Sequence, residues 1–197
     1  MLSSQERPKK GGAMAVGVLG LQGDAAEHAK MLERLGKEAR VVKGLRDLED
    51  LEGLIIPGGE STTMGRLIRR EGLDEAIKSA SFPVFGTCAG AVLLARRIAG
   101  TEQYSLGLMG MEVERNAYGR QKESFEAEVE IPALGGSYRA VFIRAPVIKQ
   151  VNEGEVLAKY RGSPILVREG RCLAATFHPE LTLDLRVHQY FLEMVDG

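Results

Sequence analysis

The chain has 197 residues, a length that fits one domain. Hydrophobic residues make up 44% and charged residues 27%, the balance of an ordinary globular protein. The net charge of −1 lacks the basic excess that nucleic-acid binding uses, and no apolar run approaches the roughly 18 residues of a membrane span. Two cysteines do not make a disulfide framework. We therefore expect a reduced, cytoplasmic protein without nucleic-acid or membrane partners.

The first residues differ in composition from the rest. The segment MLSSQERPKKGG is polar, contains Pro8 and ends in a glycine pair. This composition predicts a flexible tail over residues 1–13. No repeat or linker interrupts the remainder, so residues 14–197 are expected to form a single domain.

The first half of the chain alternates short apolar segments with amphipathic ones. Residues 16–21 are typical of a buried strand, and Asp24 and Glu27 then have the spacing of a capping box at the start of a helix that Gly36 ends. The same patterns predict strands at residues 39–42, 54–56 and 83–85 and helices at residues 64–70, 73–79 and 91–95. Such alternation predicts an α/β fold with an open, mostly parallel sheet and helices on both faces.

The second half is dominated by segments typical of strands. They cover residues 111–115, 125–131, 138–143, 156–160, 165–168 and 172–177. Short connections containing Gly or Pro predict hairpins, so antiparallel strands should be added to the sheet in this half. The chain closes with a predicted helix whose apolar stripe is Leu183, Val187, Phe191 and Met194.

Three side chains outside the main motifs have plain interpretations. Cys172 lies in an apolar strand and is expected to be a core residue. His28 and His188 are expected to face solvent or to be lightly packed. With three dispersed histidines and no CxxC pair, no metal site is expected.

The segment Phe85-Gly86-Thr87-Cys88-Ala89-Gly90 is the most informative of the chain. A nucleophile between two glycines, after a strand and before a helix, is typical of a nucleophile elbow. The sulfur would also lie at a helix N-terminus, where the macrodipole favours the reactive thiolate. The alternative is a buried structural cysteine beside two packing glycines.

A second segment, Thr176-Phe177-His178-Pro179-Glu180, supplies the partners that a nucleophilic cysteine needs. It follows an apolar strand expected to end at the same edge of the sheet. In an extended backbone, residues two apart project to the same side, so His178 could take the thiol proton while Glu180 fixes its tautomer. A surface histidine beside a turn is the alternative.

The third segment is Pro57-Gly58-Gly59-Glu60-Ser61-Thr62-Thr63. A glycine pair after a parallel strand lets backbone N–H groups point at a developing negative charge. Gly58 and Gly59 are thus expected to form an oxyanion hole with the amide of Ala89. The alternative is a strand-to-helix turn capped by Ser61 or Thr62.

Six segments taken together resemble one enzyme family. They are LGLQG, PGGEST, FGTCAG, ERNAYGRQ, FIRAP and FHPE. The set is similar to the glutaminase subunits of pyridoxal 5′-phosphate synthases, which are class I (triad) glutamine amidotransferases. The resemblance spans Ala15 to about Val195, and it implies the flavodoxin-like, three-layer α/β fold of that class.

The resemblance implies roles for individual residues. Cys88 would be the nucleophile, and His178 and Glu180 would complete the triad. Gln22 of LQG would couple docking of a partner to the oxyanion hole. The residues that contact L-glutamine would be Gly59, Glu60, Ser61, Arg115, Ile143 and Arg144.

The charges of this set match the substrate. Glutamine carries an α-carboxylate and an α-ammonium group, so its pocket needs a cation and an acceptor. Arg115 or Arg144 could supply the cation, and Glu60 or main-chain carbonyl groups the acceptor.

The implied reaction is hydrolysis of L-glutamine to L-glutamate and ammonia through a glutamyl thioester on Cys88. In the family, ammonia passes to a (β/α)8-barrel synthase subunit that makes pyridoxal 5′-phosphate, and the glutaminase is nearly silent until this subunit docks. Pyridoxal phosphate is then a product, and no cofactor is expected. Three alternatives stay open: an amidotransferase subunit for another acceptor, a stand-alone cysteine hydrolase, and a non-catalytic subunit with a relic triad.

Overall fold

The computed structural model describes residues 15–115 and 124–197. The predicted tail over residues 1–13 and most of the ERNAYGRQ segment lie outside these residues. Within them, no helix is long and apolar enough to cross a membrane.

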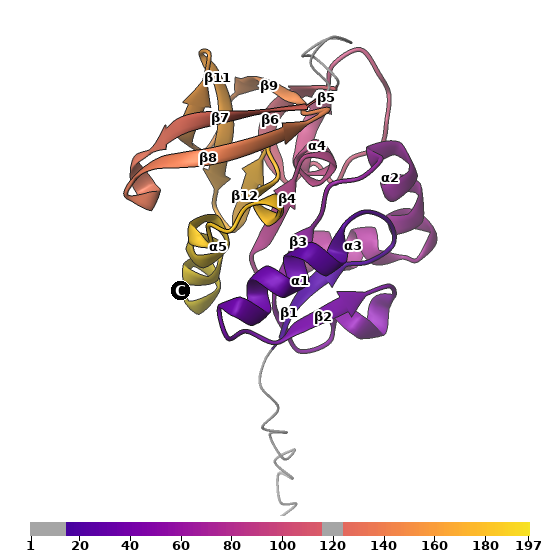
Figure 1. The fold of residues 1–197 in the computed structure, drawn as a ribbon. Coiled ribbons are helices and arrows are strands. Elements are labelled where there is room, and N and C mark those ends of the chain that lie inside the picture. Colours follow the sequence, from indigo (N-terminus) through magenta and orange to yellow (C-terminus); the bar gives the residue numbers. More distant parts are fainter. Residues whose placement is uncertain (1–14, 116–123) are drawn as a thin grey trace, which may run out of the picture.

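A seven-stranded sheet forms the centre of the molecule (Figure 1). Its order is β10-β11-β12-β4-β3-β1-β2, where β1 to β4 and β12 run parallel and β10 and β11 are antiparallel additions. This arrangement confirms the predicted mostly parallel sheet with antiparallel strands from the second half. The strands are β1 (Ala15–Leu19), β2 (Ala39–Val42), β3 (Leu51–Ile56), β4 (Val84–Thr87), β10 (Glu155–Tyr160), β11 (Ser163–Glu169) and β12 (Cys172–Ala175).

Helices cover both faces of this sheet (Figure 1). One apolar core packs α2, α3 and α4 against one face, and a second core packs α1 and α5 against the other. Strands buried on both sides explain the apolar runs in the sequence. The helices are α1 (Ala25–Arg34), α2 (Ser61–Arg70), α3 (Leu73–Ser79), α4 (Ala89–Leu94) and α5 (Arg186–Asp196), with 3-10 turns at Leu45–Leu48, Pro132–Leu134 and Pro179–Leu181.

Two smaller sheets complete the fold. Strands β7 (Ser124–Ile131) and β8 (Gly136–Ile143) form the expected hairpin. Strands β5 (Ala95–Ile98), β6 (Met109–Glu114) and β9 (Val147–Val151) form a three-stranded sheet of which only β6 was predicted. The sequence pattern did not predict β5 because its two central residues, Arg96 and Arg97, are charged and exposed, unlike those of a buried strand. The helix predicted at residues 91–95 instead ends at Leu94, and Ala95 already belongs to β5.

Two expectations about helix ends were wrong. Asp24 precedes α1 but makes no side-chain cap, and Glu27 accepts a hydrogen bond from Lys30 instead of closing a capping box. Leu183 lies before α5 with 84% of its surface exposed, so it is not part of the buried stripe that holds Val187 and Phe191.

The sheet brings three strand ends to one place. β4 lies between β3 and β12 and runs parallel to both, with Ile56 beside Gly86 and Ala175 beside Thr87. The residues that follow β3, β4 and β12 therefore emerge at the same edge of the sheet. These are the PGGEST, CAG and FHPE segments.

We predict that Gly90→Ala destabilises the fold. A Cβ at this position would lie 2.0 Å from the carbonyl oxygen of Ile56, and neither backbone can give way without disturbing the elbow. We expect a loss of about 2 kcal/mol or more in the free energy of unfolding, measured by urea denaturation. The control is Gly44→Ala, where a Cβ meets no atom within 4 Å and φ is −156°. Equal stability of the two variants would contradict the prediction.

Candidate active site

Cys88 stands in a strained turn between β4 and α4. Its φ of 50° and ψ of −105° are unusual for a residue with a side chain. Its N–H donates to the carbonyl oxygen of Ala175 at 2.8 Å, which fixes the turn to β12. A Cβ on Gly86 would lie 2.5 Å from the carbonyl carbon of Gly90, so the turn needs glycine on both sides of Cys88. The structure thus has the geometry of a nucleophile elbow.

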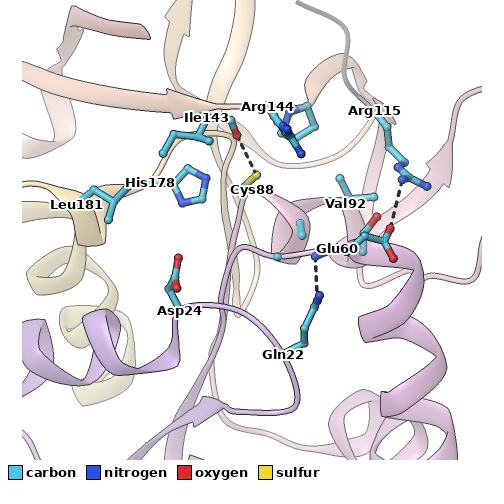
Figure 2. A pocket seen from close by; sticks show the side chains of 14 residues that line it. Gln22, Asp24, Glu60, Cys88, Val92, Arg115, Ile143, Arg144, His178 and Leu181 are labelled. Atoms are coloured by element: carbon cyan, nitrogen blue, oxygen red, sulfur yellow. Dashed lines mark hydrogen bonds and ion pairs between the residues drawn. The ribbon is translucent and has the colours of Figure 1, made fainter. Parts of the chain in front are cut away.

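The thiol of Cys88 borders a cavity and is only 7% exposed. It donates to the carbonyl oxygen of Ile143, with 3.7 Å between the sulfur and the oxygen. This bond connects the elbow to the end of β8 (Figure 2).

His178 and Glu180 are paired beside Cys88. Nδ1 of His178 lies 2.7 Å from Oε1 of Glu180, and both side chains are buried. The sequence analysis expected this pair on extended backbone, and that expectation was wrong. Residues 179–181 instead make a 3-10 turn that begins at Pro179, a residue well suited to a first helical position. The imidazole is held by this pairing with Nε2 directed away from the carboxylate.

The surroundings of His178 favour its charged form. Burial alone lowers the pKa of the imidazole, but Cys88 and Glu180 outweigh burial and raise the pKa to about 10. Nε2 of His178 has no hydrogen-bond partner among the described residues. This nitrogen is therefore available to exchange a proton with Cys88 or with a substrate.

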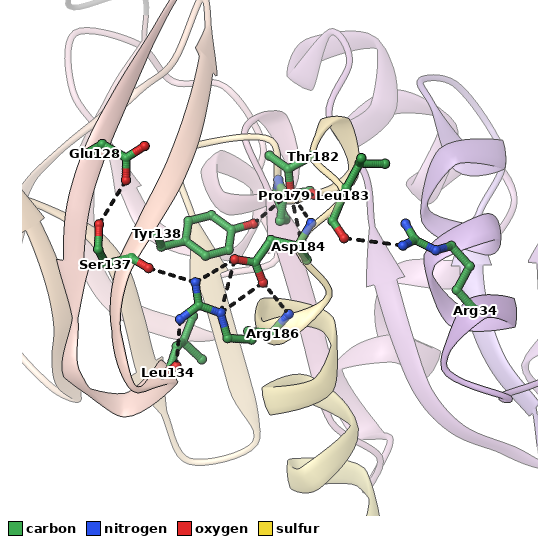
Figure 3. Close-up of polar contacts among 10 residues, drawn as sticks. All are labelled: Arg34, Glu128, Leu134, Ser137, Tyr138, Pro179, Thr182, Leu183, Asp184 and Arg186. Atoms are coloured by element: carbon green, nitrogen blue, oxygen red, sulfur yellow. Dashed lines mark hydrogen bonds and ion pairs between the residues drawn. The ribbon is translucent and has the colours of Figure 1, made fainter.

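Polar contacts fix the turn that carries His178 and Glu180 (Figure 3). The hydroxyl of Thr182 donates to the carbonyl oxygen of Pro179 at 3.0 Å, and its oxygen lies 3.2 Å from the hydroxyl of Tyr138. Arg186, at the start of α5, pairs with Asp184 and donates to backbone carbonyl groups at the end of the β7–β8 hairpin. The hairpin and α5 together hold the turn in place.

A cavity of about 430 Å³ opens next to Cys88 (Figure 2). Its walls come from all three strand ends and from the connections after β1, β6 and β8. The lining residues are Gln22, Asp24, Gly59, Glu60, Ser61, Cys88, Ala89, Val92, Arg115, Ile143, Arg144, Pro146, His178 and Leu181. Of the sequence-predicted residues, Gly58 and Glu180 do not line it.

Glu60 and Arg115 form a charged pair at the cavity wall. Nη2 of Arg115 lies 3.3 Å from Oε1 of Glu60. The Glu60 carboxylate also accepts from the N–H groups of Thr62 and Thr63, so Glu60, rather than Ser61 or Thr62, caps α2. Burial raises the pKa of Glu60, but hydrogen bonds from Thr63 and Thr62 prevail and lower the pKa to about 2. The carboxylate is therefore charged at neutral pH.

Gln103 is a site residue that the sequence analysis missed. Its Oε1 accepts hydrogen bonds from Arg115 and from the hydroxyl of Thr62, and its amide nitrogen donates to Ser61 at 3.0 Å. These bonds orient the guanidinium group of Arg115. Gln103 lies in the connection between β5 and β6, and without knowledge of β5 no sequence signal places this connection near the site.

Gln22 connects the loop after β1 to the glycine pair. Its Oε1 accepts from the N–H of Glu60 at 2.9 Å (Figure 2). Gly23 beside it is in close contact with the same segment, since a Cβ there would lie 1.9 Å from the carbonyl oxygen of Gly58. A movement of this loop would therefore move the backbone of Gly58 and Gly59.

The three residues predicted for the oxyanion hole surround the elbow. A Cβ on Gly58 would lie 2.6 Å from Cε1 of His178 and 3.5 Å from Cβ of Cys88, so a side chain here would enter the site. Gly59, with φ of 150°, and Ala89 line the cavity. Ile143 and Arg144 lie across from them at the end of β8, and Arg144 has the positive φ of 44°.

His28 and His188 contradict the sequence prediction. Both are fully buried, and they lie behind Glu180 on α1 and α5. A periodicity signal existed: His28 is three residues after Ala25 and four before Leu32, both of which are buried on the same side of α1.

Cys172 lies in β12, and burial raises the pKa of its thiol to about 11. Among residues 15–115 and 124–197, no group of three or more His, Cys, Asp or Glu side chains is placed to hold a metal ion.

Comparisons with known proteins agree with this geometry. The model of the SNO glutamine amidotransferase family matches residues 18–197. The protein named pyridoxal 5′-phosphate synthase subunit PdxT from Brevibacillus brevis is 55% identical over 186 residues, which are 92% of this chain and 97% of that protein. The protein of the same name from Thermotoga neapolitana is 54% identical over 187 residues, 92% of this chain and 100% of its own length.

Solved structures of glutamine amidotransferases are also similar to this chain. A crystal structure described as glutamine amidotransferase has a TM-score of 0.89 and 52% identity, covering 93% of this chain and 100% of its own. A glutamine amidotransferase from Thermotoga maritima, at 14% identity, has a TM-score of 0.64 over 94% of this chain and 85% of its own, a likeness of fold alone. The chain belongs to the SNO family of glutamine amidotransferases.

Proposed function

We propose that this chain hydrolyses L-glutamine and delivers the ammonia to a pyridoxal 5′-phosphate synthase subunit, and that it works in the cytoplasm. One observation carries the proposal. Cys88 and His178, which is paired with Glu180 behind it, lie on one wall of a cavity whose other wall carries the charges of Arg115 and Glu60. Such a cavity suits a ligand that carries a positive and a negative charge at one end and a reactive group at the other. The relatives named above support the acceptor, since their names contain pyridoxal 5′-phosphate synthase.

The two walls give the substrate an orientation. The α-carboxylate of glutamine would pair with Arg115, and its α-ammonium group with Glu60. Gln103 keeps Arg115 in position for this contact. The side-chain amide then extends toward Cys88, between the end of β8 and the glycine pair.

The reaction would follow from the groups around the amide carbon. His178 holds the proton that the Cys88 thiol gives up, and the resulting thiolate attacks the carbonyl carbon. The oxyanion that forms is stabilised by backbone N–H groups near Gly58, Gly59 and Ala89. His178 then donates its proton to the departing ammonia, which leaves a glutamyl thioester. His178 activates a water molecule that attacks the thioester and releases glutamate, and the thiol is restored.

The partner would be the (β/α)8-barrel synthase subunit. Gln22 and Gly23 give docking a physical route to the site, because they contact the backbone that precedes α2. In the absence of the partner, the site would be only weakly active.

We predict that Cys88→Ala abolishes glutaminase activity and that Cys172→Ala preserves it. Cys88 borders the cavity, whereas Cys172 is a core residue whose thiol has a raised pKa. Glutamate release is measured with the synthase subunit present, and a glutamine-mimicking electrophile is located by mass spectrometry. Ammonium salts should restore pyridoxal phosphate formation to the Cys88→Ala complex. Labelling at Cys172 instead of Cys88 would contradict the assignment of Cys88 as the nucleophile. If ammonium salts fail to restore pyridoxal phosphate formation, the ammonia is delivered to another acceptor.

A second prediction concerns Arg115. Its replacement by Ala should raise KM for glutamine by at least about tenfold, because a hydrogen bond to a charged group contributes about 1.5–3 kcal/mol. Steady-state kinetics provide the measurement. Arg97→Ala is the control, since Arg97 is exposed and pairs with Glu112 away from the cavity. An unchanged KM in the Arg115 variant would remove this residue from the binding site.

A third prediction concerns Gln22. Gln22→Met removes the acceptor of the Glu60 N–H group, a bond of about 1 kcal/mol, and should lower stimulation by the synthase about fivefold. Co-elution in size-exclusion chromatography should show that the subunits still associate. The same substitution at the exposed Gln189 of α5 is the control. Full stimulation of the Gln22 variant would mean that docking reaches the site by another route.

A further inference from the structure

A buried polar chain lies behind the catalytic carboxylate of the proposed triad. Nδ1 of His28 lies 2.9 Å from Nε2 of His188. Nε2 of His28 lies 3.1 Å from the hydroxyl oxygen of Thr87 and 3.4 Å from Oε2 of Glu180. His28, Thr87 and His188 are all 0% exposed, and Glu180 is 4% exposed. The chain therefore connects α5, α1, β4 and the 3-10 turn of the triad without contact to solvent.

The partners of these atoms decide which nitrogen of His28 carries the proton. If Nε2 of His28 carried no proton, its lone pair would face Oε2 of Glu180 at 3.4 Å, and the two lone pairs would repel each other. The proton would then lie on Nδ1 of His28 and point at Nε2 of His188. His188 would carry its own proton on Nδ1, which has no acceptor among the described residues. A buried N–H without an acceptor is costly.

The opposite assignment leaves no buried N–H group unpaired. Nε2–H of His28 then pairs with the hydroxyl oxygen of Thr87 and lies 3.4 Å from Oε2 of Glu180, and Nδ1 of His28 accepts from Nε2–H of His188. Among the atoms of this polar chain, only two acceptors have no hydrogen-bond partner among the described residues: Nδ1 of His188 and Oε2 of Glu180. The geometry thus selects one tautomer for both histidines.

We propose that His28, with its tautomer set by His188, is a positioning residue that holds the second oxygen of Glu180. Oε1 of Glu180 is paired with His178, whereas Oε2 has no hydrogen bond among the described residues and lies 3.4 Å from Nε2 of His28. The N–H dipole of His28 therefore attracts Oε2 at close range and restrains rotation of the carboxylate. The inference rests on the proposed function, because it assigns His28 a task in the same triad.

The charges around His28 agree with a neutral donor. The groups that face it are His188 on α5, Glu180 on the 3-10 turn, Thr87 on β4 and, further away, His178. Burial and then the charges of His188 and His178 keep the pKa of His28 well below its ordinary value. Burial also lowers the pKa of His188, to about 3. Both imidazoles are thus neutral wherever the enzyme works, and one proton per ring is available.

The test compares variants of the full chain in the presence of the synthase subunit. His28→Leu removes the donor and should lower kcat about tenfold or more, as loss of an outer hydrogen-bond partner commonly does, while KM for glutamine stays unchanged. His28→Gln, whose amide N–H can reach the same place, should recover part of the lost kcat.

A matched control separates positioning from packing. Leu32→Ala, one turn further along α1 and fully buried, weakens the same helix without touching the polar chain. Its thermal stability should fall while its kcat, measured well below the melting temperature, stays that of the unmodified protein. An equal loss of kcat in Leu32→Ala would overturn the proposal.

Nitrogen-15 NMR of the histidine rings tests the tautomers directly. Both His28 and His188 should carry the proton on Nε2, and a proton on Nδ1 of His28 would overturn the proposal. So would an unchanged kcat in a folded His28→Leu variant. The Cys88→Ala variant distinguishes the two levels: if it stays active, the proposed function fails, and if it is inactive while His28→Leu is fully active, only this inference fails.

Discussion

The parallel pairing of β4 with both β3 and β12 is the constraint on which the site depends. Parallel strands end at a common edge, and three adjacent ends bring together segments that are about thirty and ninety positions apart in the chain. Cys88 is then held by its own N–H bond to Ala175, the last residue of β12. Any change that shifts the register of β12 against β4 would separate the sulfur from His178, whatever the side chains themselves could do.

Close backbone packing makes this edge rigid. The glycines at positions 23, 58, 86 and 90 all lie where a Cβ would meet another backbone or a side chain of the triad. Strain at Cys88 is maintained by these contacts and by the buried strands beneath them. The charged groups are restrained in the same way: Glu60 by the first turn of α2, Arg115 by Gln103, and His178 by Glu180. Preorganised charges need little rearrangement when a substrate enters.

Local patterns predicted the elements well where burial was simple. Strands with two buried faces gave apolar runs, so the strand predicted at residues 54–56 coincides with the buried end of β3. Sequence patterns did not predict β5 and β9, because these strands present charged or polar residues to solvent. The predicted cap at Asp24 was wrong, since its side chain makes no capping hydrogen bond. A single pattern of alternation cannot reveal which neighbour a short strand will pair with.

The sequence by itself determined which chemical groups are available: a cysteine between glycines, a His-Pro-Glu turn and a glycine pair before a helix. Local spacing is enough for such motifs, since each is short and formed by adjacent residues. Only the tertiary structure decided what surrounds them. Gln103 contacts Ser61, which is 42 positions away in the chain, and His28 lies beside Glu180 from the far end of the sequence. The burial of His28 and His188 depends on the helices that pack together around them. Contacts of this kind arise from the packing of whole elements, which no short window of residues contains.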